Sequence, residues 1–143
     1  MLFRSGLGLA LCLPEQRVIV FDGDGSLLMN LGSLSTMARY RPRKLVHVVF
    51  DNESLLSVGG FPTATSTGTD LEGIARSSGI PRVTTVRSVE SFNSAVTAAM
   101  QGSELTTIVA KVEAKGPAAY VTDLSLLENR FQFRRHIQTL KTS

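Results

Sequence analysis

Two oxygen-bearing side chains, Asp24 and Asn52, each follow a short apolar run and could bind one metal ion together. Magnesium prefers oxygen ligands and usually takes one or two carboxylates together with substrate phosphates. Asp24 lies in a predicted loop between Gly23 and Gly25, and a glycine turn before a helix leaves backbone N–H groups free for phosphate. One carboxylate, one amide oxygen and a nearby backbone carbonyl therefore suit a metal ion that bridges a diphosphate.

A parallel sheet would position these two side chains. Residues 18–21 are apolar and mostly β-branched, which predicts a buried parallel strand, and residues 45–50 predict a second strand. Between them, apolar residues recur at helical spacing over 30–40. A right-handed crossover makes neighbouring strands parallel, so we expect Asp24 and Asn52 to meet at one carboxyl edge.

The same alternation of strand and helix continues through the chain. We predict further helices and strands from caps, glycine stops and apolar runs: a helix at 6–13, a helix at 71–78, a strand at 83–86, a helix from 88 to 100 and a strand at 106–112. This pattern predicts an α/β fold, with a doubly wound, mainly parallel sheet and helices on both faces.

The Gly-Asp-Gly sequence at 23–25, followed after 26 residues by Asn52, resembles the cofactor motif of thiamine-diphosphate-dependent enzymes. A lone Gly-Asp-Gly is also a common turn, but strand, motif, helix, spacing and Asn together are specific. Within that superfamily, residues 25–32, 45–53 and 57–60 are similar to phosphonopyruvate and sulfopyruvate decarboxylases. The resemblance covers nearly the whole chain.

The resemblance implies the thiamine-diphosphate-binding fold, with thiamine diphosphate and Mg²⁺ as cofactors. The cofactor-binding residues that it implies are Gly23, Asp24, Gly25, Ser26, Asn52 and Ser54. Among them, Asp24, Asn52 and the backbone carbonyl of Ser54 would be the metal ligands. The implied function is the pyrophosphate-binding half of a 2-oxo acid decarboxylase, acting on 3-phosphonopyruvate or 3-sulfopyruvate. The alternative is a fragment of an acetolactate-synthase-like or other thiamine-diphosphate enzyme.

The resemblance also implies a partner. In the family, a glutamate from a separate pyrimidine-binding domain activates the cofactor, so the catalytic residue is not assigned to this chain. We therefore expect a homo- or hetero-oligomer with a pyrimidine-binding subunit or domain, and no activity without it.

Residues 55–69 show no periodicity and are rich in Gly, Ser and Thr, which predicts a loop that is functional or mobile. In the resemblance this loop lies over the thiazolium end of the cofactor, and Ser57, Gly59 and Gly60 belong to the substrate loop. Relatives usually carry a Gln where this chain has Phe61 and a polar or aromatic residue at 55–56, and these differences concern the substrate.

A phosphatase is a more distant alternative. Residues 21–28 also look like the first motif of haloacid-dehalogenase-type phosphatases, in which Asp22 would be the nucleophile and Asp24 the acid/base. That fold needs a later lysine and a pair of carboxylates after other strands. The strand ends near Arg87 and Lys111 carry no acidic pair, which disfavours this reading.

Composition excludes several classes of protein. The net charge of +3 arises entirely in residues 128–143, which are better interpreted as a solvated helix or a subunit contact, so we expect no nucleic-acid partner. The apolar run at 6–13 is far shorter than the ~20 residues that cross a membrane, so we expect no membrane partner. A single cysteine excludes an internal disulfide framework and is consistent with a cytoplasmic location.

The sequence divides into three parts. Residues 1–5 match nothing expected of the family and are predicted to be non-native or disordered, at the start of an N-terminally truncated domain. Residues 6–116 are the predicted thiamine-diphosphate and Mg²⁺-binding domain. Residues 117–143 form a predicted C-terminal extension, with a helix around Leu127, Phe131 and Ile137 that packs on the domain or on a partner.

Overall fold

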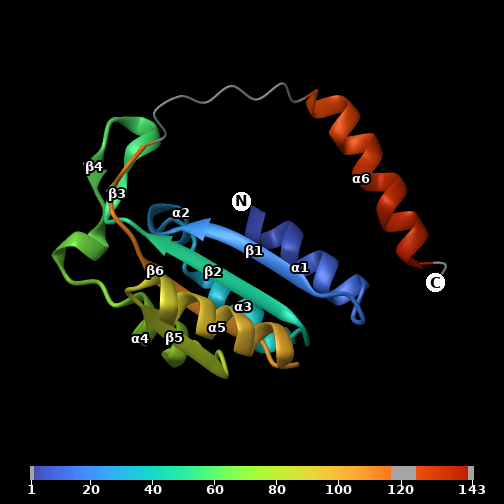
Figure 1. Ribbon diagram of the computed structural model, residues 1–143, viewed down its shortest axis with the longest axis horizontal. Helices are drawn as coiled ribbons and strands as arrows, with labels where there is room; N and C mark the ends of the chain where they lie inside the picture. Colours follow the sequence, from blue (N-terminus) through green and yellow to red (C-terminus); the bar gives the residue numbers. More distant parts are fainter. Residues whose placement is uncertain (1, 117–124, 142–143) are drawn as a thin grey trace.

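A parallel sheet of four strands forms the centre of the molecule in the computed structural model, which describes residues 2–116 and 125–141 (Figure 1). The strands lie in the order β1-β2-β6-β5 and are β1 (Val18–Gly23), β2 (Leu45–Asp51), β6 (Thr106–Lys111) and β5 (Arg82–Val86). All three pairings are parallel. The predicted parallel sheet is thus confirmed.

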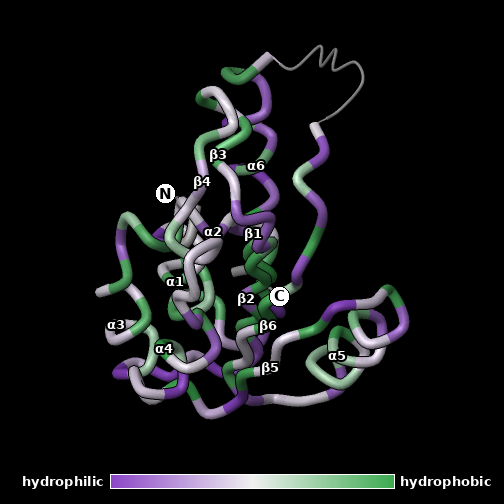
Figure 2. Tube along the Cα trace, turned by 90° about the vertical axis from the view of Figure 1, so that its left-hand side faces the viewer, coloured by the Kyte–Doolittle hydropathy of each residue, from purple (hydrophilic) through white to green (hydrophobic). Residues whose placement is uncertain are grey.

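Helices cover both faces of this sheet, as expected of a doubly wound fold. The helices are α1 (Leu2–Cys12), α2 (Asp24–Leu28), α3 (Gly32–Tyr40), α4 (Leu71–Ser77) and α5 (Val89–Gln101). Residues of α1, α2, α3 and α4 share one apolar core with the sheet, whereas α5 packs on a second core formed with β2, β5 and β6. Figure 2 shows the two central strands as hydrophobic tubes between these layers.

Local sequence explains where several helices begin and end. Ser88 caps α5 by accepting a hydrogen bond from the backbone N–H of Ser91, whose side chain accepts one in return. Helix α3 ends at Tyr40, and its C-cap Arg41 takes a left-handed conformation immediately before Pro42. The capping serines and the proline thus determine where these helices begin or end, which the spacing of apolar residues alone does not.

The first unit differs from the prediction in two ways. Residues 22–26 are not a loop, because β1 runs to Gly23 and α2 begins at once with Asp24, while the next helix starts at residue 32. The prediction that residues 18–21 are buried holds for Val20 but was wrong for Ile19 and Phe21, which are 40% and 58% exposed because β1 is an edge strand. Position in the sheet, rather than residue type, decides this exposure.

The segment predicted as an irregular loop is partly ordered. It contains a small hairpin of β3 (Ser54–Leu55) and β4 (Phe61–Pro62), with 3₁₀ turns at Leu56–Val58 and Ala64–Thr67. Gly59 and Gly60 take positive φ angles of 108° and 77°, which a residue with a side chain rarely adopts. These glycines explain the sharp return of the chain between β3 and β4.

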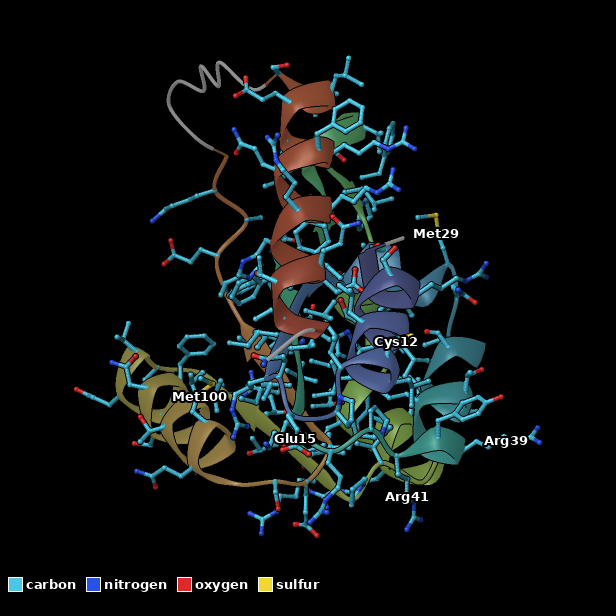
Figure 3. All side chains as sticks on the ribbon, turned by 90° about the vertical axis from the view of Figure 1, so that its right-hand side faces the viewer. Cys12, Glu15, Met29, Arg39, Arg41 and Met100 are labelled. Carbon is cyan, nitrogen blue, oxygen red and sulfur yellow. The ribbon has the colours of Figure 1, made fainter. Side chains whose placement is uncertain are left out.

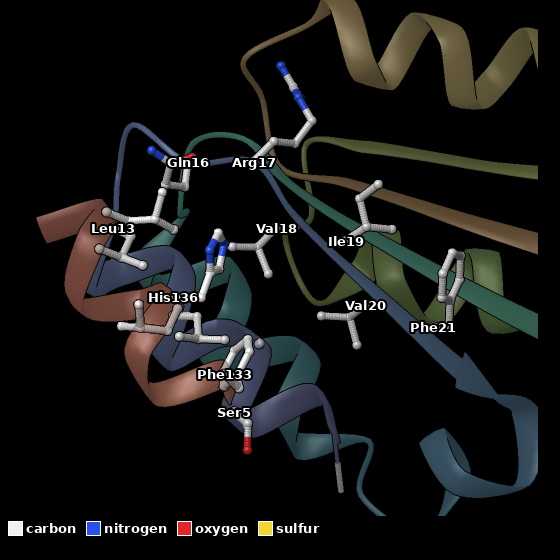
Figure 4. Close-up of a pocket in the computed structure, with 14 residues that line it drawn as sticks. Ser5, Leu13, Gln16, Arg17, Val18, Ile19, Val20, Phe21, Phe133 and His136 are labelled. Carbon is white, nitrogen blue, oxygen red and sulfur yellow. The ribbon is translucent and has the colours of Figure 1, made fainter. Parts of the chain in front are cut away.

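The first and the last helix of the chain lie side by side. Helix α6 (Leu126–Lys141) runs beside α1 (Figure 3), and Phe133 and His136 face the region of Val18 (Figure 4). Helix α1 begins at Leu2, four residues before the predicted start, whereas Met1 and residues 117–124 lie outside the described residues. The three-part division of the chain stays a prediction. No helix within 2–116 or 125–141 has the length and apolar character of a membrane span.

Candidate functional site

The Gly-Asp-Gly turn forms the junction between β1 and α2. Gly23 is the N-cap of α2 in an extended conformation, and Asp24 is its first residue, so the N–H groups of the first turn lack partners inside the helix. A Cβ atom on Gly25 would lie 2.3 Å from Cδ2 of Leu55. The hairpin therefore packs directly on the turn, and only glycine fits without a rearrangement.

The Asp24 carboxylate is buried beneath this hairpin, with the residue only 2% exposed. The hydroxyl groups of Thr63 and Thr65 both lie within hydrogen-bond distance of Oδ2, the latter at 3.1 Å. Among the residues that the structure describes, no Lys, Arg or His pairs with Asp24. A buried carboxylate without a cation is costly, so this position fits a site that takes up a positive ion.

The turn after β2 presents the second predicted set of oxygen atoms. Oδ1 of Asn52 accepts a hydrogen bond from the backbone N–H of Ser54 at 3.0 Å, and Glu53 between them takes a positive φ of 59°. Ser54 faces Pro62 in the hairpin. The backbone N–H of Thr63 donates to the carbonyl of Glu53, so Ser54 and Pro62 form a non-hydrogen-bonded pair, and the role of the Ser54 carbonyl as a metal ligand stays a prediction.

Lys111 fixes the turn to the neighbouring strand. Its Nζ atom lies 2.7 Å from Oδ2 of Asp51, which is 1% exposed, and 2.9 Å from Oε1 of Glu53. Burial lowers the pKa of Lys111, but hydrogen bonds to the two carboxylates and their charges raise it by more, so it lies above its ordinary value. The ammonium group stays charged at neutral pH and holds both residues that flank Asn52.

The carboxylate of Asp22 contacts the backbone of Gly23 and a buried histidine, His47. Its Oδ1 accepts the N–H of Gly23 at 3.0 Å, and Oδ2 lies 3.5 Å from Nε2 of His47. Burial raises the pKa of Asp22, but hydrogen bonds from His47 and Ser26, the charge of His47 and the Gly23 N–H lower it by more, so it lies below its ordinary value. Asp22 is thus engaged within the fold.

The structure places the predicted residues along one edge but not in direct mutual contact. Because β1 and β2 pair in parallel, Asp24 and Asn52 both follow strand ends at the carboxyl edge of the sheet. The link between them runs through Thr65, whose hydroxyl oxygen also lies 2.8 Å from Oδ1 of Asp51. No group of three His, Cys, Asp or Glu side chains that could hold a metal ion occurs in the described part of the chain.

Sequence reasoning missed the residues that organise this edge. Thr63, Thr65, Asp51 and Lys111 were not assigned to the site, because a buried threonine or an ion pair between strands leaves no periodic signal. The predicted substrate-loop residues Ser57, Gly59 and Gly60 lie at the exposed tip of the hairpin region. Their role in substrate binding stays a prediction.

Two cavities help to locate the site. One of about 340 Å³ borders the Gly-Asp-Gly turn and is lined by Asp22, Ser26 and Asn30 among others. Another, of about 560 Å³, is lined mainly by apolar residues between α6 and the α1–β1 unit (Figure 4). The smaller cavity adjoins the polar edge, whereas the lining of the larger one includes His136 but no carboxylate.

Known proteins were compared with this chain. Residues 3–110 match the family model described as "Thiamine pyrophosphate enzyme, C-terminal TPP binding domain". Sulfopyruvate decarboxylase subunit beta of Methanocaldococcus jannaschii is 44% identical over 106 residues, which are 74% of this chain and 55% of the relative. Phosphonopyruvate decarboxylase of Streptomyces viridochromogenes is 42% identical over 95 residues, or 66% of this chain and 23% of the relative.

Solved structures agree with this assignment. The thiamine diphosphate-dependent 4-hydroxybenzoylformate decarboxylase of Rhodococcus jostii superposes with a TM-score of 0.65 at 25% identity, over 78% of this chain and 22% of that chain. This chain therefore spans only part of each of these relatives, about half of the first. The matched residues include both polar turns, and the chain belongs to the thiamine pyrophosphate enzyme family, whose C-terminal cofactor-binding domain it contains.

Proposed function

We propose that this chain binds thiamine diphosphate with Mg²⁺ at the edge formed by the Asp24 and Asn52 turns. The observation that carries the proposal is the Asp24 carboxylate, buried to 2% exposure and without a cation partner among the described residues. Asp24, Oδ1 of Asn52 and the carbonyl of Ser54 would hold the metal. Gly23, Gly25 and Ser26 would hold the diphosphate through N–H and hydroxyl groups.

The residues of this chain would bind and orient the cofactor rather than react. When bound, thiamine diphosphate supplies the electron sink for loss of CO₂ from a 2-oxo acid. The metal would offset the like charges of Asp24 and the diphosphate, which otherwise repel each other. Lys111 keeps the turn that contains Asn52 in place, and the hairpin with Ser57, Gly59 and Gly60 would lie beside the substrate.

We further propose that the whole protein is a 2-oxo acid decarboxylase that acts on 3-sulfopyruvate or 3-phosphonopyruvate. The relatives named above support this choice, and one of them is named as a beta subunit. A pyrimidine-binding subunit or domain would complete the active site and supply the glutamate that activates the cofactor. The assembly would be a homo- or hetero-oligomer.

Calorimetric titration tests the cofactor site. Thiamine diphosphate should bind in the presence of Mg²⁺, and binding should be lost in EDTA. Asp24→Ala should weaken binding by about 10- to 100-fold, because a contact with a charged group contributes roughly 1.5–3 kcal/mol. Asp22→Asn is the matched control and should bind as the wild type does. Equal affinity with and without the metal would contradict the role of Asp24.

Activity distinguishes the decarboxylase from the phosphatase alternative. Mixing the chain with its pyrimidine-binding partner should release CO₂ from 3-sulfopyruvate or 3-phosphonopyruvate. The chain should not hydrolyse phosphate esters, since Oδ1 of Asp22 is occupied by the Gly23 N–H and its Oδ2 lies beside His47. Phosphate release that depends on Asp22, without cofactor binding, would overturn the proposed function.

A further inference from the structure

Two threonines are buried within an otherwise exposed stretch of the chain. Thr63 and Thr65 are 6% and 5% exposed, whereas Ala64 and Ser66 beside them face solvent. Both buried hydroxyls point at the same oxygen of Asp24, Oδ2, and they lie 2.9 Å from each other. This arrangement draws the segment after β4 down onto the carboxylate.

Thr63 and Thr65 contact only one of the two carboxylate oxygens of Asp24. Every hydrogen bond to this side chain from the described residues reaches Oδ2 and none reaches Oδ1. A carboxylate held in this way cannot rotate freely about its last bond. Magnesium usually takes a carboxylate through one oxygen, and hydrogen bonds to the other oxygen fix the direction in which the free one points.

Thr65 also connects Asp24 with the Lys111 ion pair. Its hydroxyl lies 3.1 Å from Oδ2 of Asp24 and 2.8 Å from Oδ1 of Asp51, whose other oxygen binds Lys111. Asp51 immediately precedes Asn52. The hydroxyl therefore joins the two turns that carry the proposed metal ligands.

The number of protons in this cluster is too small for its contacts. The hydroxyls of Thr63 and Thr65 have two protons, but four short oxygen–oxygen contacts join them to each other and to the two carboxylates. At least two of these contacts therefore lack a proton of their own, and the oxygen atoms that they join repel each other. Positive charge at Asp24 would reduce this repulsion, so a bound cation should hold the threonine segment closed.

We propose that Thr63 and Thr65 are positioning residues that aim Oδ1 of Asp24 at the cation, and that Thr65 couples cation binding to closure of residues 56–69. This inference rests on the proposed function. Because coupling is reciprocal, Mg²⁺ with thiamine diphosphate should close the segment, and loss of the Thr65 hydroxyl should weaken binding of the pair.

Titration of the full chain with Mg²⁺ and thiamine diphosphate tests this coupling, with hydrogen exchange of residues 56–69 as a second measurement. In the wild type, the pair should bind and should slow exchange in this segment. Thr65→Val should bind about tenfold more weakly and lose the protection, because the hydroxyl is absent. Thr65→Ser should restore both. Thr67→Val is the matched control, since its hydroxyl is exposed and binds only the carbonyl of Ala64.

The possible outcomes distinguish failure of this inference from failure of the proposed function. If the wild type binds the pair and Thr65→Val shows the same affinity and the same protection from hydrogen exchange, this inference is overturned and the proposed function stays intact. Failure of Thr65→Ser to restore binding would overturn it too, since the hydroxyl would then not be the active group. Absence of metal-dependent binding in the wild type would overturn both. If Thr65→Val does not fold, Thr63→Val carries the same expectation, and exchange in the wild type needs no variant.

Discussion

Removal of Lys111 tests how strongly the sheet holds the Asn52 turn. In Lys111→Met the side chain keeps its apolar stem but loses the ammonium group, which leaves the carboxylate of Asp51 buried at 1% exposure. Removing one partner of a buried ion pair costs about 3–5 kcal/mol. Because the Lys111 side chain is 22% exposed, water screens part of this interaction, and we expect a loss of about 2–3 kcal/mol.

Urea denaturation followed by circular dichroism at pH 7 would measure this loss, which corresponds to a melting temperature lower by about 10 °C. Lys115→Met is the control, because Lys115 pairs with Glu113 in an exposed position and should change stability by less than about 0.5 kcal/mol. The double variant Lys111→Met/Asp51→Asn also removes the buried charge that is left without a partner, so it should recover much of the lost free energy of unfolding. If Lys111→Met unfolds at the same urea concentration as Lys115→Met, the ion pair does not stabilise the turn.

The same pair predicts a pH dependence at the alkaline end. The pKa of Lys111 is raised in the folded state above its unfolded value of 10.5. Its contribution to the free energy of unfolding is therefore fully present below pH 10.5 and is lost as the pH rises through the folded value. Lys111→Met should remove this part of the alkaline destabilisation, whereas a wild-type and a mutant curve that fall in parallel above pH 10.5 would speak against the raised pKa.

Three further perturbations address other parts of the site. Asn52→Leu should lose metal-dependent cofactor binding while circular dichroism stays native, and Asn52→Asp should recover part of the binding; normal binding by Asn52→Leu would place the metal elsewhere. Gly25→Ala should lower stability by about 1–3 kcal/mol in urea denaturation, because its Cβ meets Leu55, and Leu55→Ala in the same chain should relieve much of this cost. The pKa of Asp22 is lowered in the folded state, so its contribution to the free energy of unfolding is present above pH 3.8 and is lost as the pH falls through the folded value. Asp22→Asn should therefore lose less stability than the wild type as the pH falls below 3.8. An equal loss in both proteins would contradict the contact between Asp22 and His47.

The strands of the sheet could be predicted to within two residues at each end, because parallel strands buried on both faces read as continuous apolar runs. The position of Asp24 and Asn52 after neighbouring strands, at one edge of the sheet, followed from the same topology. Burial of β1 could not be predicted, since its sequence is as apolar as that of β2 and only the strand order makes it an edge.

The hairpin and the two buried threonines that follow it could not be predicted, for a different reason. Thr63 and Thr65 stand in a run of small polar residues that is typical of a loop, and their burial depends on Asp24, far away in the sequence. The pairing of Lys111 with Asp51 likewise needs the register of β2 against β6. Contacts of this kind are tertiary, and no local pattern encodes them.

The strand order has a consequence for how the molecule folds. Val18 pairs with Leu45 and Arg82 pairs with Thr106, so each half of the sheet can form from a local strand–helix–strand unit. Val46, however, pairs with Thr106, which is 60 residues away in the sequence. Joining the halves requires closure of a long loop, which is slow and should limit the folding rate.

The Lys111–Asp51 pair lies on this seam between the halves. Contacts that form after the rate-limiting step change the unfolding rate more than the folding rate. We therefore expect Lys111→Met to unfold faster while it refolds at nearly the wild-type rate. The polar edge that gathers the proposed ligands would then be the last part of the domain to assemble and the first to come apart.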